Sequence, residues 1–90
     1  MQTLSLNFHL NRLKSDLSGK DILKYFETHY FYLERMKGSH MVMKRLDKEQ
    51  KQILIIPNHK IISKGTLKAV ISQAERYISI ENLKKFFYTD

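Results

Sequence analysis

The chain has 90 residues, of which 42% are hydrophobic and 11% aromatic, and it contains no cysteine. This length excludes a second independent core, and this composition excludes a disordered chain. Without cysteine there is no disulfide framework and no thiolate metal site, which indicates a reducing cytosol. Sixteen Lys and Arg residues against nine Asp and Glu residues give a net charge of +7, which favours a polyanionic partner such as nucleic acid.

The positive charge is concentrated in the second part of the chain. Residues 37–90 carry eleven basic and five acidic side chains, whereas residues 1–36 carry five and four. We expect the surface that faces a polyanion in the second part, although a basic soluble protein without such a partner has the same composition. No apolar stretch approaches the roughly 18 residues of a membrane span, and no signal-peptide pattern opens the chain, so a cytoplasmic protein that binds no membrane is expected.

Residues 1–17 form an N-terminal extension with a pattern of its own. From Leu4 to Leu10, apolar residues alternate with polar ones, which predicts an extra edge strand. A disordered leader is the alternative interpretation of this segment. The folded domain is expected over residues 18–90.

This domain begins with a predicted helix over residues 19–28. Ser18 followed by Asp21 is typical of a capping box, and apolar residues then recur at helical spacing. Three antiparallel strands are predicted next, because short alternating segments are separated by turn residues. The strands are expected at residues 30–36, 40–45 and 53–56, with a turn at 37–39 and a hairpin loop at 46–51.

Two more helices complete the predicted domain. Pro57 ends the third strand, and residues 58–62 connect it to an amphipathic helix over residues 64–76, which Ser63 caps. Ser79 caps a short last helix. The order of helix, three-stranded antiparallel sheet and helix predicts an α+β fold with helices packed on one face of the sheet.

Few residues suggest chemistry. The chain has no glycine-rich phosphate loop, no carboxylate pair at helical spacing and no cluster of metal ligands, so neither a cofactor nor a metal ion is expected. Ser39 and His40 do not form a catalytic triad, because neighbouring strand residues point to opposite faces. His40 remains, at the start of the predicted second strand. The basic residues in the segments around it are Lys37, Lys44, Arg45, Lys60, Lys64 and Lys68.

His40 is the candidate for acid–base chemistry. A histidine titrates near neutrality, at about 6.5, and can exchange a proton in phosphodiester chemistry while cations hold the phosphate. On chemistry alone, an ordinary surface or hydrogen-bonded histidine is the more frequent role of such a residue.

Four short motifs occur in an order and spacing that resemble those of HicA toxins. They are Ser18-Gly19-Lys20, the run from Glu34 to His40, the segment from Ile55 to Lys60, and Ser63-Lys64-Gly65-Thr66-Leu67 followed by Gln73-Ala74. The similarity extends over about residues 18–87. Each motif alone is weak, and their combination is specific.

The resemblance implies a double-stranded-RNA-binding-like fold, and a toxin of a toxin–antitoxin pair that cleaves messenger RNA. The family's catalytic histidine corresponds to His40, and the glycine of its preceding turn corresponds to Gly38. The implied partner is a HicB antitoxin that covers the RNA-binding face and whose complex binds the operator DNA of their own operon. Many members have a second histidine where this chain has Met41, so a two-histidine mechanism is not expected here.

The resulting hypothesis is a metal-independent mRNA endoribonuclease in which His40 is the general base or acid. The residues expected to bind RNA or phosphate are Lys37, Gly38, Ser39, Lys44 and Lys64. Two alternatives stay open. One is a non-catalytic RNA-binding module of the same fold, and the other is a protein-interaction domain whose basic face binds an acidic partner.

Overall fold

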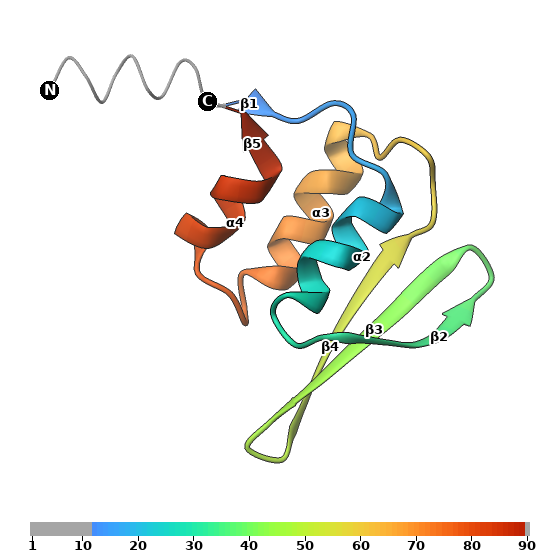
Figure 1. Ribbon diagram of the computed structural model, residues 1–90, viewed down its shortest axis with the longest axis vertical. Helices are drawn as coiled ribbons and strands as arrows, with labels where there is room; N and C mark the ends of the chain where they lie inside the picture. The colour runs from blue at the N-terminus through green and yellow to red at the C-terminus, as the bar shows by residue number, and fades with distance from the viewer. Residues whose placement is uncertain (1–11, 90) are drawn as a thin grey trace, which may run out of the picture.

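The computed structural model describes residues 12–89 (Figure 1). Its elements are β1 (Arg12–Leu13), α2 (Gly19–Glu27), β2 (Tyr32–Lys37), β3 (His40–Asp47), β4 (Gln50–Pro57), α3 (Lys64–Ala74), α4 (Ile80–Phe87) and β5 (Tyr88–Thr89). The predicted edge strand from Leu4 to Leu10 lies outside the described residues. None of the helices between residues 12 and 89 combines the length and the apolar character needed to cross a membrane.

The fold has a sheet layer and a helix layer. β2, β3 and β4 form an antiparallel sheet in that spatial order, and α2, α3 and α4 lie together on one side of it (Figure 1). The predicted α+β class and the order of helix, three-stranded sheet and helix are therefore confirmed. We call the sheet face that points away from the helices the open face.

The core lies between the sheet and the helices. Met41 and Met43 of β3 are opposite Ile56 and Leu54 of β4, and all four side chains are buried. The helices add apolar residues at helical spacing. The largest of these that are fully buried are Ile22, Phe26, Leu67, Val70, Leu83 and Phe87. The alternating pattern of the strands and the helical pattern thus meet in one core, as the sequence predicts.

Two features fix the first turn of α2. The Ser18 hydroxyl accepts a hydrogen bond from the Asp21 backbone N–H (3.0 Å), and the Asp21 carboxylate accepts one from the Ser18 N–H (2.9 Å). This confirms the predicted capping box, and the bonds from Ser18 lower the pKa of Asp21. Gly19 lies so close to β4 that an added Cβ atom would stand 2.1 Å from the Pro57 carbonyl oxygen. Only glycine fits at this contact.

Arg45 joins three parts of the fold. Its guanidinium group donates to the side-chain oxygen of Gln52 on β4 (2.7 Å) and to the carbonyl oxygen of His29 before β2 (2.9 Å). It also donates to the carbonyl oxygen of Tyr77 between α3 and α4 (3.3 Å). Arg45 therefore holds two connecting segments, one before β2 and one between the last two helices, against the sheet.

The hairpin between β3 and β4 is shorter than predicted. In place of a loop over residues 46–51, both strands continue to a two-residue turn of Lys48 and Glu49. These residues have φ angles of 51° and 70°, typical of a type I′ turn that usually contains Asn and Gly. The loop prediction was wrong because Lys and Glu carry no such turn signal, while cross-strand pairing extends to Asp47 and Gln50.

A second, small ladder was not predicted. β1 pairs antiparallel with β5, with Arg12 opposite Thr89 and Leu13 opposite Tyr88. Strands of two residues have no periodicity that a sequence analysis can detect. The predicted helix over residues 64–76 also ends slightly earlier, at Ala74.

We expect Gly19→Ala to lower the free energy of unfolding by about 3 kcal/mol, because the new methyl group overlaps a backbone oxygen and α2 must move away from β4. The matched control is Gly65→Ala in the first turn of α3, where an added Cβ atom has nothing within 4 Å. The control is expected to leave stability unchanged or to raise it by up to about 1 kcal/mol. Urea unfolding followed by circular dichroism measures both, and equal stabilities would contradict the packing argument.

Candidate functional site

The strand register arranges the side chains of the open face in rows. Residues directly opposite each other in an antiparallel ladder point to the same face. Three rows cross from β2 through β3 to β4: Lys37, His40 and Pro57; Arg35, Val42 and Ile55; Tyr32, Lys44 and Ile53. His40, Val42 and Lys44 therefore lie together on the open face of β3, as strand alternation over residues 40–45 indicates.

A hollow of about 430 Å³ lies beside His40 on this face. Its lining residues are Lys37, Gly38, His40, Val42 and Ile55. We call it the His40 hollow. Val42 is only 4% exposed although it points to the open face, whereas Ile55 is 44% exposed. One hollow thus brings together an exposed imidazole, a lysine side chain and apolar surface, and three of the predicted site residues contribute to it.

The turn between β2 and β3 forms one rim of the hollow. Gly38 has a φ angle of +60° and is the first of two central turn residues, which is the pattern of a type II′ turn. An added Cβ atom at Gly38 would have nothing within 4 Å, so the backbone angle and not the available space favours glycine. The Ser39 carbonyl oxygen accepts a hydrogen bond from the Asn58 N–H (2.8 Å), which ties the turn to the segment after β4.

Lys44 lies on the open face but is already paired. Its ammonium group donates to the Glu34 carboxylate over 2.6 Å, and Arg35 contacts the same carboxylate at 3.5 Å. The hydrogen bond from Lys44 lowers the pKa of Glu34, and the same bond raises the pKa of Lys44. A phosphate that binds Lys44 must compete with this carboxylate.

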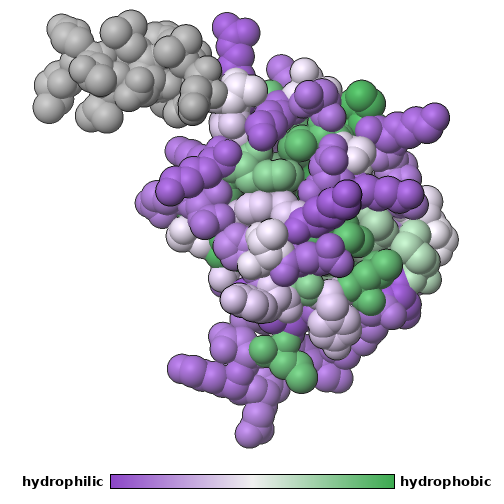
Figure 2. All heavy atoms as spheres, viewed as in Figure 1, coloured by the Kyte–Doolittle hydropathy of each residue, from purple (hydrophilic) through white to green (hydrophobic). Residues whose placement is uncertain are grey.

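The other predicted residues lie outside the lining of the hollow. Ser39 is exposed in the turn, next to His40. Lys64 is exposed in the first turn of α3, so the structure does not bring it into the hollow. Arg45 lies on the helix side with its donors engaged, which corrects the expectation that it belongs to the cations around His40. Hydrophilic residues cover much of the face shown in Figure 2, so hydrophilic surface alone does not locate a site.

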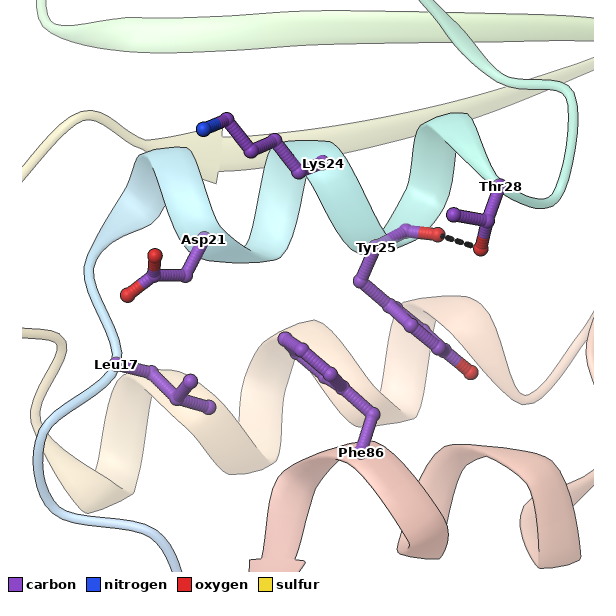
Figure 3. A pocket seen from close by; sticks show the side chains of 6 residues that line it. All are labelled: Leu17, Asp21, Lys24, Tyr25, Thr28 and Phe86. Atoms are coloured by element: carbon purple, nitrogen blue, oxygen red, sulfur yellow. Dashed lines mark hydrogen bonds between the residues drawn. The ribbon is translucent and has the colours of Figure 1, made fainter.

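A second pocket, of about 510 Å³, lies between α2 and α4 (Figure 3). The Tyr25 ring stacks on Phe86 with centroids 4.2 Å apart, and the Tyr25 hydroxyl donates to Asn82. Burial raises the pKa of Tyr25 to about 12. The acidic residue that lines this pocket, Asp21, belongs to the capping box. The side chains that line this second pocket therefore contribute to the packing and capping of the helices. The His40 hollow is the better candidate site.

Of the comparisons with known proteins, the one with family models gives a match. The family model for the HicA toxin of bacterial toxin–antitoxin systems matches residues 19–75. The chain belongs to the HicA toxin family. The matched region runs from the first residue of α2 to the end of α3 and contains the whole His40 hollow. This HicA chain is therefore a toxin of a toxin–antitoxin system, which implies an antitoxin partner. No curated protein and no solved structure matches it.

The apolar lining of the hollow is only partly predictable from the sequence. The alternation of β3 places Val42 on the same face as His40, and this signal is present in the sequence. Ile55 reaches the hollow only because it is opposite Val42 in the ladder of β3 and β4. That register depends on the hairpin turn, which the sequence did not indicate.

The pairing of Glu34 with Lys44 predicts a pH effect. Because the folded pKa of Glu34 is lowered, the pair stabilises the protein at neutral pH, and this contribution is lost as the pH falls through the folded pKa. In a Lys44→Met variant, the pKa of Glu34 is expected to rise toward the ordinary value of about 4.3. Carboxyl NMR titration of both proteins measures the change. An unchanged Glu34 pKa would show that Lys44 does not cause the shift.

Proposed function

We propose that this HicA toxin is an mRNA endoribonuclease and that His40 is its general acid–base residue. The observation that carries the proposal is the position of the exposed imidazole in a hollow on the open face, in the same row as Lys37. The face is accessible to a polymer, and the row presents a proton acceptor next to a cation. A proton acceptor and a cation that stabilises phosphoryl charge both accelerate phosphodiester cleavage.

The proposed reaction uses the ribose 2′-hydroxyl as the nucleophile. His40 accepts its proton, the 2′-oxygen attacks the adjacent phosphorus, and the bond from phosphorus to the 5′-oxygen breaks. Negative charge develops on the phosphoryl oxygens, and the Lys37 ammonium group stabilises it. The departing 5′-oxygen takes a proton from water or from the imidazolium that has formed.

The residues proposed to bind phosphate differ in their distance from the hollow and in whether their charge is already paired. Lys37, Gly38 and Ser39 come from the turn beside His40, where the backbone of a glycine approaches RNA closely. Lys44 adds a cation whose charge Glu34 partly offsets. Lys64, at the start of α3, extends the contact beyond the hollow to a more distant phosphate.

We further propose that no resident metal ion takes part and that the partner is a HicB-type antitoxin. No group of three His, Asp or Glu side chains that suits a metal gathers within residues 12–89.

The open face exposes Tyr32, Ile53 and Ile55 between its cations, and such mixed surface suits a protein partner as well as RNA. In this proposal the complex acts in the cytoplasm and binds operator DNA through the antitoxin.

We expect His40→Ala to reduce RNA cleavage by about 10² to 10⁴-fold and to abolish growth arrest, because the general base is removed. Circular dichroism should be unchanged, since His40 is exposed. The matched control is His59→Ala, an exposed histidine outside the lining of the hollow, which should retain cleavage. The RNA cleavage assays of the parent chain and of both variants are run with EDTA present. Toxicity retained in His40→Ala would remove this residue from the mechanism, and loss of cleavage in EDTA would contradict metal independence.

The interaction of Glu34 with Lys44 provides a second test, on RNA affinity. Glu34→Gln removes the carboxylate that neutralises Lys44, so RNA should bind more tightly, whereas Lys44→Gln should weaken binding. Each phosphate that becomes bound or is released should change the slope of log affinity against log salt by about 0.7 for single-stranded RNA. Fluorescence anisotropy in a His40→Ala background measures both. Equal affinities would show that Lys44 does not bind phosphate.

A non-catalytic RNA-binding module is the second candidate function. It is favoured by the surroundings of His40: within residues 12–89 the histidine ring that forms a hydrogen bond is that of His29, with Asn82, and no such bond orients the His40 ring. The resemblance to HicA toxins adds that Met41 stands where many members have a second histidine. This candidate predicts salt-dependent RNA binding by the wild-type chain with no cleavage under any condition. The ribonuclease proposal predicts both binding and cleavage.

A further inference from the structure

The two edge strands of the sheet differ in whether their outer backbone groups are hydrogen-bonded. On β4, the Gln73 side chain from α3 covers the backbone of Ile55: its Oε1 accepts from the Ile55 N–H (3.0 Å), and its Nε2 donates to the Ile55 carbonyl oxygen (3.1 Å). On β2, all six residues are exposed, and no strand among the described residues pairs with the outer edge. The backbone groups along that edge are available to another strand.

Apolar side chains accompany this unpaired edge. Leu33 and Met36 are opposite Met43 and Met41 and so point to the helix side of the sheet, yet they are 41% and 46% exposed. In Figure 2, green apolar groups lie among polar ones in the region where Figure 1 draws β2 and β3. Exposed apolar residues beside unpaired backbone groups indicate an interaction surface.

A bulge sets which face each residue of β2 occupies. The register shifts between Leu33 and Arg35, so that two consecutive residues share the open face. Tyr32, Glu34, Arg35 and Lys37 are on the open face, and Leu33 and Met36 are on the helix side. The order in which residues 32–37 point to the open face and the helix side is therefore symmetric: it is the same from Tyr32 to Lys37 as from Lys37 to Tyr32.

We propose that a second copy of this chain pairs with β2 through its own β2, in antiparallel orientation. The two-fold axis passes between Glu34 and Arg35 and is perpendicular to the sheet, so that both open faces lie on the same side. The pairs are Glu34 with the partner's Arg35, Leu33 with the partner's Met36, and Tyr32 with the partner's Lys37. Each pair joins residues of the same face, as antiparallel pairing requires.

The chemistry of these pairs favours a second copy over an unrelated strand. A carboxylate meets a guanidinium group, an apolar side chain meets another, and an aromatic ring meets an ammonium group. A strand with regular alternation could not use this register, because each residue would be opposite one that points to the other face. Bulges and charges commonly protect an edge from pairing. Here the bulge and the order of charges are those that self-pairing needs.

The pairing also places a residue of the second copy near the His40 hollow. Lys37 is opposite His40 on one side and opposite the partner's Tyr32 on the other. With neighbouring strands about 4.8 Å apart, the partner's Tyr32 lies about 10 Å from His40 on the same face. An aromatic ring at this place offers an RNA base a surface for stacking. This last step rests on the proposed ribonuclease function, whereas the pairing itself does not.

The test measures self-association of the full chain by sedimentation equilibrium. All proteins carry His40→Ala, which is expected to abolish growth arrest and so to allow the chain to be produced in cells. The parent is expected to form dimers as its concentration rises. Glu34→Arg and Arg35→Glu each place like charges across the axis and should weaken dimerisation by about tenfold or more. An equimolar mixture of the two should restore it, because their charges complement each other. A parent that stays monomeric at millimolar concentration, or variants that dimerise like the parent, would overturn the proposal.

Cross-linking tests the register, since the chain offers a background without cysteine. Leu33→Cys mixed with Met36→Cys is expected to form a disulfide-linked pair on mild oxidation, because these positions are opposite each other on one face. The matched control is Leu33→Cys mixed with Ile53→Cys, which lies on the other edge strand and should not cross-link. Equal cross-linking in both mixtures would overturn the register. A dimer of the chain with His40 intact that binds but does not cut RNA would contradict the proposed function and leave the pairing intact.

Discussion

The close approach of α2 to the end of β4 is the contact on which the site depends. Gly19 leaves no room for a Cβ atom against the last carbonyl group of β4, and its N–H donates to the His59 carbonyl oxygen (2.9 Å). The neighbouring Asn58 N–H donates to the Ser39 carbonyl oxygen (2.8 Å). Backbone contacts therefore run without interruption from α2 to the turn before His40. The position of the imidazole follows from how one helix packs, although no helix residue lines the His40 hollow.

Positive charge serves different purposes at different places in this sheet. Arg45 donates to backbone and amide oxygens and lies 4.6 Å from the centroid of the Phe31 ring, so it belongs to the structural framework. Lys44 is on the open face but is bound to Glu34. Lys37 lines the hollow itself. A net charge of +7 indicates a polyanionic partner, and only the face and the pairing of each cation show which of them that partner can reach.

The parts of the fold that could be predicted are those with a periodic pattern and a cap. Ser18 and Ser63 mark helix starts in the sequence, and alternation assigns His40 and its neighbours to faces of β3. The rest depends on pairing between segments. The turn at Lys48 and Glu49 sets the register of β4 through backbone angles that these residue types rarely adopt, so the approach of Ile55 to the hollow could not be predicted from the sequence. The bulge in β2 could not be predicted either, because it too depends on how two segments pair.

The two faces of the sheet separate stability from function. Met43 and Leu54 on the helix side are fully buried, whereas Tyr32 and Ile53 on the open face are nearly half exposed and add little to the core. Phosphate binding alone requires only cations, so in the proposed function the exposed apolar residues in these rows contact the apolar surface of a ligand, such as an RNA base or a protein. In the proposed function, an antitoxin seated on these rows covers the His40 hollow directly. Inhibition then follows from steric exclusion and requires no change in the fold of the toxin.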